Sequence, residues 1–465
     1  MSFASVSFIV FFACVLLVTA FLERRGARRG KEVFLLLASY FFYGYWDWRF
    51  CFLLLFVTVS SCFTAKASEN KVFYTVGIVV PLLVLGFFKY FNFFLSSLSA
   101  LIGRDIGSLR IILPVGISFY TFQALSYVID AHRGKIPVEQ DFVKLALYIS
   151  FFPQLVAGPI VRAADFLPQL SENRRVTLEN FKTGIQIMVF GLFKKIVLAD
   201  HLSVFVDDVY AKPAAFAWTT LLFTAMAYYM QIYLDFSGYS DMAIGCAKCF
   251  GYDFNRNFNI SFISQNLTEF WKRQHISLST WLKEYLYIPL GGNRKGRARQ
   301  YLNLFVTMFL GGLWHGANWT FAFWGSLNGL VLILEKLWPW KRKTPRAPVW
   351  QACRVIINFV FVSLTLIFFR AGSFSTSWAV FKGIFTLQQG IFQPFSWFFV
   401  TVIIYIVAGA AAIAKSQEKD WSGANGYYPI LNLDSVPGLT VFFIALGLIL
   451  GLAYTGANPF VYFQF

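Results

Sequence analysis

Charged residues are scarce in this chain of 465 residues: only 14% are charged, whereas 57% are hydrophobic. So few charges exclude an ordinary soluble protein and favour a membrane protein. No soluble domain or low-complexity linker interrupts the chain, and no repeat recurs at a fixed period. We therefore expect one integral-membrane domain over residues 1–465, with the last span and an aromatic C-terminal motif in 437–465.

Cysteine is also scarce and forms no framework. The six cysteines are scattered through apolar stretches, which excludes a disulfide scaffold. Cys246 and Cys249 have the spacing of a metal-ligand pair, but no second pair or nearby histidine completes a site, so we interpret them as packed thiols. The sequence predicts neither a metal site nor a tightly bound cofactor.

Acidic residues are outnumbered, since 40 Lys and Arg against 23 Asp and Glu give a net charge of +17. The cations lie in short loops between apolar runs, where membrane topology and anionic lipid explain them. No nucleic-acid-binding signature accompanies this charge, so lipid is an expected partner and nucleic acid is not.

Long apolar runs are what the chain has in abundance. Uncharged stretches long enough to cross a bilayer recur at 2–22, 213–234, 385–414 and 437–465. They are continuously apolar, which excludes the alternating pattern of a membrane β-barrel. The sequence predicts an all-α polytopic protein with about 11 spans plus re-entrant or interfacial helices. A basic cluster at 24–31 follows the first span, which places this loop in the cytoplasm and the N-terminus outside. Counting spans forward from Arg346 places the C-terminus outside as well.

Two segments differ from ordinary spans. Residues 151–162 (FFPQLVAGPIVR) contain two prolines and a glycine, which predicts a re-entrant element that lines a funnel. Lys182, Lys194 and Lys195 interrupt a helical segment, so we expect them to snorkel or to mark a helix in the membrane interface.

His315 lies halfway along an uncharged run of 35 residues, 300–334. Basic residues flank both ends of this run, so it must enter the membrane and return, and Gly311, Gly312, Gly316 and Asn318 near its midpoint are turn formers. His315 would then lie roughly 20 Å into a hydrocarbon layer about 30 Å thick. An ionisable side chain at that depth predicts a water-accessible functional site, in which a neutral imidazole is suited to act as a base. The alternative is a histidine that only packs between helices.

His275 follows Lys272 and Arg273 and is expected at the cytoplasmic margin, where spacing alone leaves function and packing equally open. His132 and His201 stand beside Asp130 and Asp200, and we interpret both as solvated loop residues. The cluster with Arg294, Lys295 and Arg297 would bind a polyphosphate ligand, although a positive-inside loop has the same composition.

Four segments together carry a resemblance to a known family. They are the WHG-containing run with His315, FWKRQHISLSTWLKEYLYIPLGGNRKG with His275, YLDFSGYSDMAIG (residues 233–245) and LVAGPIVR (residues 155–162). This combination resembles the membrane-bound O-acyltransferase family, especially its bacterial alginate and peptidoglycan O-acetylation branch. The resemblance implies a multi-pass protein of the bacterial inner membrane whose helices surround a central tunnel. Its catalytic histidine would be His315, and His275 matches the second catalytic-region position of the family.

The C-terminal sequence NPFVYFQF is similar to the aromatic motif of this branch, which implies that Tyr462 is an acyl carrier. A phenol activated by a base can accept an acyl group from a thioester. The resemblance thus implies acetyl-coenzyme A as donor, Arg294, Lys295 and Arg297 at its phosphates, and an envelope-anchored partner acetyltransferase that delivers acetyl to a polysaccharide. Two alternatives stay open: direct acylation of a lipid or protein hydroxyl, or a transporter of a polysaccharide precursor. On composition, the final aromatic residues could equally anchor the last helix at the interface.

Overall fold

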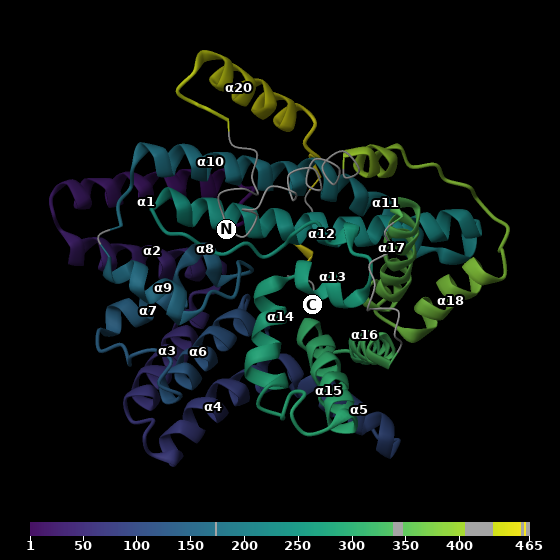
Figure 1. Cartoon of the computed structure of the whole chain (residues 1–465), viewed down its shortest axis with the longest axis horizontal. Helices are drawn as coiled ribbons and strands as arrows, with labels where there is room; N and C mark the ends of the chain where they lie inside the picture. Colours follow the sequence, from purple (N-terminus) through teal and green to yellow (C-terminus); the bar gives the residue numbers. More distant parts are fainter. Residues whose placement is uncertain (173, 338–346, 405–430, 457–459, 462–465) are drawn as a thin grey trace. The chain divides into compact units, whose positions relative to one another are not determined.

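The computed structural model describes residues 1–465 except 173, 338–346, 405–430, 457–459 and 462–465. Within these described residues the secondary structure is helical, and the one β-type pairing is an isolated bridge between Phe216 and Ile391 (Figure 1). The all-α prediction is therefore confirmed for the described part of the chain.

The helices gather into two compact units. The first contains Met1–Gly191, Tyr239–Arg256 and Ile430–Ser435, and the second contains Leu192–Gly238, Asn257–Pro429 and Val436–Phe465. Both units therefore combine segments that are far apart in the sequence. The expectation of one domain over residues 1–465 stays a prediction.

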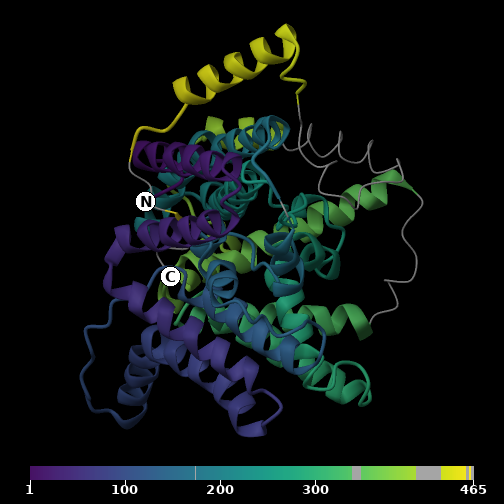
Figure 2. The same ribbon diagram turned by 90° about the vertical axis from the view of Figure 1, so that its left-hand side faces the viewer.

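The first unit begins with a series of capped helices. Its helices are α1 (Val6–Arg24), α2 (Arg28–Asp47), α3 (Arg49–Lys66), α4 (Lys71–Leu85), a π-helical turn (Gly86–Tyr90), α5 (Phe91–Ile102), α6 (Ile117–His132), α7 (Phe142–Ser150), α8 (Phe152–Leu155), α9 (Ala163–Ser171) and most of α10 (Leu178–Leu192). Side chains of Ser5, Asn70 and Asp141 accept hydrogen bonds from backbone N–H groups in the first turns of α1, α4 and α7. Figure 2 shows the purple helices α1 and α2 side by side, and Phe11 of α1 packs on Phe42 of α2 at 5.7 Å between ring centroids.

The second unit carries the histidine-containing segments. Its elements are a π-helical stretch (Phe193–Ala199), α11 (Asp200–Ala211), a 3₁₀ turn (Pro213–Ala215), α12 (Trp218–Cys249, which continues into the first unit), a 3₁₀ turn (Ser261–Ile263), α13 (Leu267–Arg273), α14 (Ile276–Leu282), a π-helical turn (Lys283–Tyr287), α15 (Arg297–His315), α16 (Trp319–Leu337), α17 (Pro348–Arg370), α18 (Phe374–Phe385) and α20 (Val436–Gly451). The predicted last span thus contains α20, which ends at Gly451.

Four helical stretches among the described residues are long and apolar enough to cross a membrane. They are Val6–Arg24, Arg49–Lys66, Lys71–Ile102 and Pro348–Arg370. The shorter α20 is also apolar. The larger expected number of about 11 spans stays a prediction, since several of the remaining helices are short or carry buried polar residues.

The segment with two prolines is broken, as its sequence predicts. Helix α7 ends at Ser150, α8 makes a single turn, and no helix follows until α9 begins at Ala163. Phe151, Phe152 and Leu155 are fully buried within the first unit, so this irregular backbone lies against protein, where it can be satisfied. Whether it lines a funnel stays a prediction.

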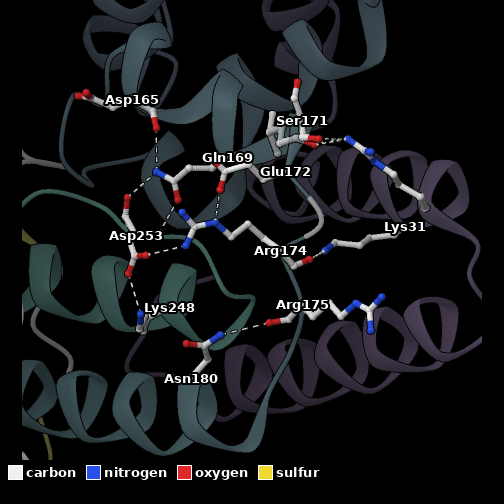
Figure 3. A network of polar contacts seen from close by, with 12 residues as sticks. Lys31, Asp165, Gln169, Ser171, Glu172, Arg174, Arg175, Asn180, Lys248 and Asp253 are labelled. Atoms are coloured by element: carbon white, nitrogen blue, oxygen red, sulfur yellow. Dashed lines mark hydrogen bonds and ion pairs between the residues drawn. The ribbon is translucent and has the colours of Figure 1, made fainter.

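A polar network ties loops of the first unit together (Figure 3). Asp253 accepts hydrogen bonds from Arg174 at 3.1 Å and from Lys248 at 2.7 Å, while Lys31 donates to the backbone carbonyl of Arg174 at 2.6 Å. Gln169 bonds the backbone of Asp253 in both directions. Basic residues that the sequence assigns to loops therefore also hold these loops in place.

Candidate functional site

His315 lies at the tip of a helical hairpin in the second unit. Helix α15 ends at His315, Gly316 continues in extended backbone, and α16 begins at Trp319, where the Asn318 side chain accepts a hydrogen bond from the N–H of Thr320 at 2.9 Å. The uncharged run therefore enters and returns as predicted, with Gly316 and Asn318 in the turn.

Gly311 and Gly312 do not form the turn, which corrects the expectation from sequence. Both lie inside α15. A Cβ built on Gly312 would lie 2.3 Å from the carbonyl oxygen of Phe321 and 3.0 Å from the Cα of Gly325. The missing side chain is needed for close contact between α15 and α16, which lie side by side in Figure 1.

The His315 ring is enclosed by aromatic side chains. It is 6% exposed and meets Trp314, Trp324 and Phe369 at centroid distances of 5.1, 5.4 and 5.2 Å. A neutral imidazole in such a setting offers one ring nitrogen that can take a proton.

His275 also contacts Trp314. Its ring is 5.7 Å from the Trp314 ring, and the residue is 2% exposed. It precedes α14 with a φ of +45°, a left-handed conformation that non-glycine residues rarely adopt. Such backbone strain persists where surrounding structure enforces it, and it is frequent at functional sites.

Asn257 fixes the orientation of His275. Its side-chain oxygen lies 3.2 Å from Nδ1 of His275 and also accepts hydrogen bonds from the backbone N–H and the hydroxyl of Ser277, at 3.1 and 2.9 Å. Because this oxygen can only accept, Nδ1 of His275 carries the proton, and Nε2 of a neutral ring is then the basic nitrogen. The pKa of His275 lies well below its usual value, first because the ring is buried and then because His315 is nearby.

A cavity of about 470 Å³ connects the surface with His315. Trp271, Trp324 and the buried His315 line it together with the exposed Lys272, Lys283 and Lys336. This volume falls in the range of small-molecule sites, about 300–1,000 Å³. The expected water-accessible approach to His315 is therefore present, and it has cations at its exposed end.

Arg294, Lys295 and Arg297 lie elsewhere. They are exposed in the loop before α15 and in its first turn, and they are not among the residues that line the cavity. Their assignment to donor phosphates stays a prediction. Tyr462 lies outside the described residues, so its role as carrier also stays a prediction.

The remaining histidines and the cysteine pair have structural surroundings. His132 is exposed at the end of α6, whereas His201 lies within α11 and stacks on Trp397 at 4.2 Å, so neither is in a loop as expected. Cys246 and Cys249 are fully buried, in keeping with packed thiols. Within the described residues no cluster of three or more metal-ligating side chains occurs.

Sequence reasoning missed several residues of the site. The three cavity lysines look like ordinary loop cations in sequence, and Asn257 lies 18 residues before the histidine it orients. Its one sequence signal is position in a polar stretch just before the His275 motif. The chain path from Asn257 through α13 that brings the Asn257 amide to the His275 ring cannot be predicted from their spacing in the sequence.

Comparison with known proteins identifies the family of the chain. Residues 35–371 match the model of the membrane-bound O-acyltransferase family. The chain is 35% identical to the probable alginate O-acetylase AlgI of Azotobacter vinelandii, over 94% of this chain and 95% of that protein. It is 34% identical to the corresponding protein of Pseudomonas putida over the full length of both, and 34% identical to the peptidoglycan O-acetyltransferase of Helicobacter pylori over 77% and 74%.

The family match covers most of the chain, including both histidines, the hairpin and the whole cavity. Enzymes of this family transfer acyl groups to hydroxyls, which is the chemistry that a neutral histidine base at the end of a cavity permits. The chain belongs to the membrane-bound O-acyltransferase family.

Proposed function

We propose that this enzyme moves an acetyl group from cytoplasmic acetyl-coenzyme A to a polysaccharide of the bacterial cell envelope, from a position in the inner membrane. The observation that carries the proposal is the cavity that joins three exposed lysines to the buried His315. Relatives named as alginate O-acetylase and peptidoglycan O-acetyltransferase support acetyl as the group and a glycan as the final acceptor.

The donor binds along the cavity, with its anionic end at the surface. Lys272, Lys283 and Lys336 attract the phosphates, and the apolar wall leads the thioester toward His315. Arg294, Lys295 and Arg297, in the neighbouring exposed loop, add to the positive field that guides the donor toward the chain.

His315 acts as the general base. It takes the proton of an acceptor hydroxyl, the oxygen attacks the thioester carbonyl, and the C–S bond breaks so that coenzyme A leaves as its thiol with a proton. His275, held by Asn257, positions the reacting groups and assists proton movement.

The first acceptor is the phenol of Tyr462. The product, a phenyl ester, is itself a reactive acyl donor, so it suits a carrier that hands acetyl onward. A partner acetyltransferase anchored in the envelope then takes the group from the tyrosine and delivers it to polysaccharide hydroxyls. No metal or bound cofactor takes part in these steps.

The test is incubation of the purified protein with radiolabelled acetyl-coenzyme A, followed by mass mapping of the labelled peptide. We expect label on the C-terminal peptide of the wild type, no label in Tyr462→Phe, and no turnover in His315→Ala. Label on a lipid or on another side chain would support direct acylation. A complete absence of acetyl-coenzyme A turnover in the wild type would instead leave transport as the function.

A further inference from the structure

A buried ionic cluster lies in the second unit, in the segment with Lys194 and Lys195. The Lys195 ammonium lies 2.5 Å from a carboxylate oxygen of Asp235 and 2.8 Å from one of Asp200. Asp235 is 1% exposed and Lys195 is 6% exposed. Both lysines are therefore inside the protein, and Lys194 donates to the hydroxyl of Ser237 at 3.2 Å. The expectation that Lys194 and Lys195 snorkel is wrong, because carboxylates and a hydroxyl of the unit itself bind them. Whether their helix lies in the membrane interface stays a prediction.

The second oxygen of Asp235 binds the end of the chain. It accepts a hydrogen bond of 2.9 Å from the backbone N–H of Val461. A further backbone bond holds the same segment, since the N–H of Tyr454 donates to the carbonyl of Ile196 at 2.9 Å. Phe460 and Val461 are buried at 4% and 7% exposure. The C-terminal segment is thus bound to Asp235 itself and to Ile196, the residue after Lys195.

This anchoring point lies beside the histidine site. Phe460 packs on Phe236 at 5.7 Å, and Phe236 meets the His275 ring edge-on at 4.6 Å. One aromatic ring therefore separates the bound segment from His275. All of these residues belong to the second unit.

A carboxylate is a suitable group for this purpose. A hydrogen bond from an N–H to an ionised acceptor is roughly twice as strong as one between neutral groups. The Lys195 ammonium lies 2.5 Å from Asp235 and pairs with it in a buried position, where a lone carboxylate would be expensive to maintain. Because the donor is a backbone group, the bond fixes the path of the chain and leaves the neighbouring side chains free to act.

We propose that Asp235, held by Lys195, is a positioning residue that anchors the C-terminal segment beside the histidine pair. The residue after Val461 is Tyr462, so the anchor sets where the carrier side chain can reach. In this respect the inference rests on the proposed function, whereas the anchoring itself can be tested separately.

The test compares Val461→Pro with Val461→Ala. Both replace the valine side chain, but only proline lacks the N–H that donates to Asp235. Carboxypeptidase digestion of the full-length protein in detergent measures release of the chain end, and mass mapping after acetyl-coenzyme A measures acetyl on the C-terminal peptide. Asp235→Ala removes the acceptor while Lys195 keeps Asp200 as its partner, so no buried charge is orphaned.

We expect Val461→Pro and Asp235→Ala each to be digested about tenfold faster than Val461→Ala, with a similar loss of acetylated peptide. The double variant Asp235→Ala/Val461→Pro should be no faster than either single variant, because both remove the same bond. Equal digestion of the proline and alanine variants, or additive effects in the double variant, would overturn the anchoring. If wild-type Tyr462 carries no acetyl group, the carrier step fails, and the digestion rates still decide the anchoring.

Discussion

Asn257 is the side chain on which the orientation of His275 depends. Its amide oxygen accepts a hydrogen bond from Nδ1 of His275 and two more from the backbone N–H and the hydroxyl of Ser277. Orientation through a hydrogen bond to the second ring nitrogen is a common way to fix which nitrogen of a histidine is basic. Without the Asn257 amide, the buried His275 ring could also carry its proton on Nε2, and Nε2 would then no longer be the basic nitrogen.

We predict that Asn257→Ala lowers kcat for acyl transfer by about tenfold or more and leaves the donor KM nearly unchanged, because Asn257 does not line the cavity. Steady-state kinetics with acetyl-coenzyme A check this. Ser277→Ala is the matched control, since it removes a different donor to the same oxygen and should have the smaller effect. A change in KM alone would contradict the orienting role.

The lowered pKa of His275 predicts a pH dependence of stability. An unfolded chain binds a proton at this histidine below pH about 6.5, whereas the buried ring in the folded protein stays neutral to a lower pH. Its contribution to stability is thus present above that pH and declines as the pH falls toward the folded pKa. Thermal unfolding at pH 7.5 and pH 5 should show a smaller acid loss in His275→Gln than in the wild type. Equal losses would mean that His275 is protonated in the folded protein.

The α15–α16 hairpin depends on close contact between two glycines. A methyl group on Gly312 would meet the backbone of Phe321 and Gly325, which cannot move aside as a flexible side chain does. We predict that Gly312→Ala lowers the free energy of unfolding by about 1–3 kcal/mol and reduces activity by displacing His315. Thermal unfolding and acyl transfer measure the two effects.

Gly447→Ala in α20 is the control, because a Cβ there meets nothing within 4 Å. It should be neutral or slightly stabilising, since alanine is the better helix former. Similar losses in the two variants would contradict close packing at Gly312 as the cause.

The sequence predicted this hairpin but not its packing. Basic flanks and a run too short for two complete spans required an entry and a return, and His315 was expected near the tip. The sequence could not show that Gly316 lies in the turn while Gly312 lies at the contact between the two helices, because both roles call for the same residue type. The buried Lys195–Asp235 pair was missed for a related reason: its partners lie 40 residues apart, and only the fold brings them together.

Across the whole molecule, the net charge of +17 has more than one use. Some cations tie loops together, as Arg174 and Lys248 do at Asp253, and others line the cavity. Composition predicted the membrane class and the excess of cations, but it could not divide them between topology, structure and ligand binding.

We predict that Lys272→Gln/Lys283→Gln/Lys336→Gln raises the KM for acetyl-coenzyme A by about tenfold with a smaller change in kcat, because several exposed charge pairs are lost. The comparison variant is Arg294→Gln/Lys295→Gln/Arg297→Gln, which removes the same number of charges outside the cavity. We expect it to have the weaker effect and to act mainly through long-range attraction that salt screens. A larger effect of the loop variant at high salt would place the donor phosphates at the loop.

The shared cavity also makes the enzyme open to chemical inhibition. A small molecule with an anionic head and a slender apolar arm would reach the three lysines that line the cavity and cover the His315 imidazole at the same time. Replacing His315 to escape such an inhibitor would also remove the imidazole that we propose as the base, so inhibitors of this kind should direct most of their contacts to that end of the cavity.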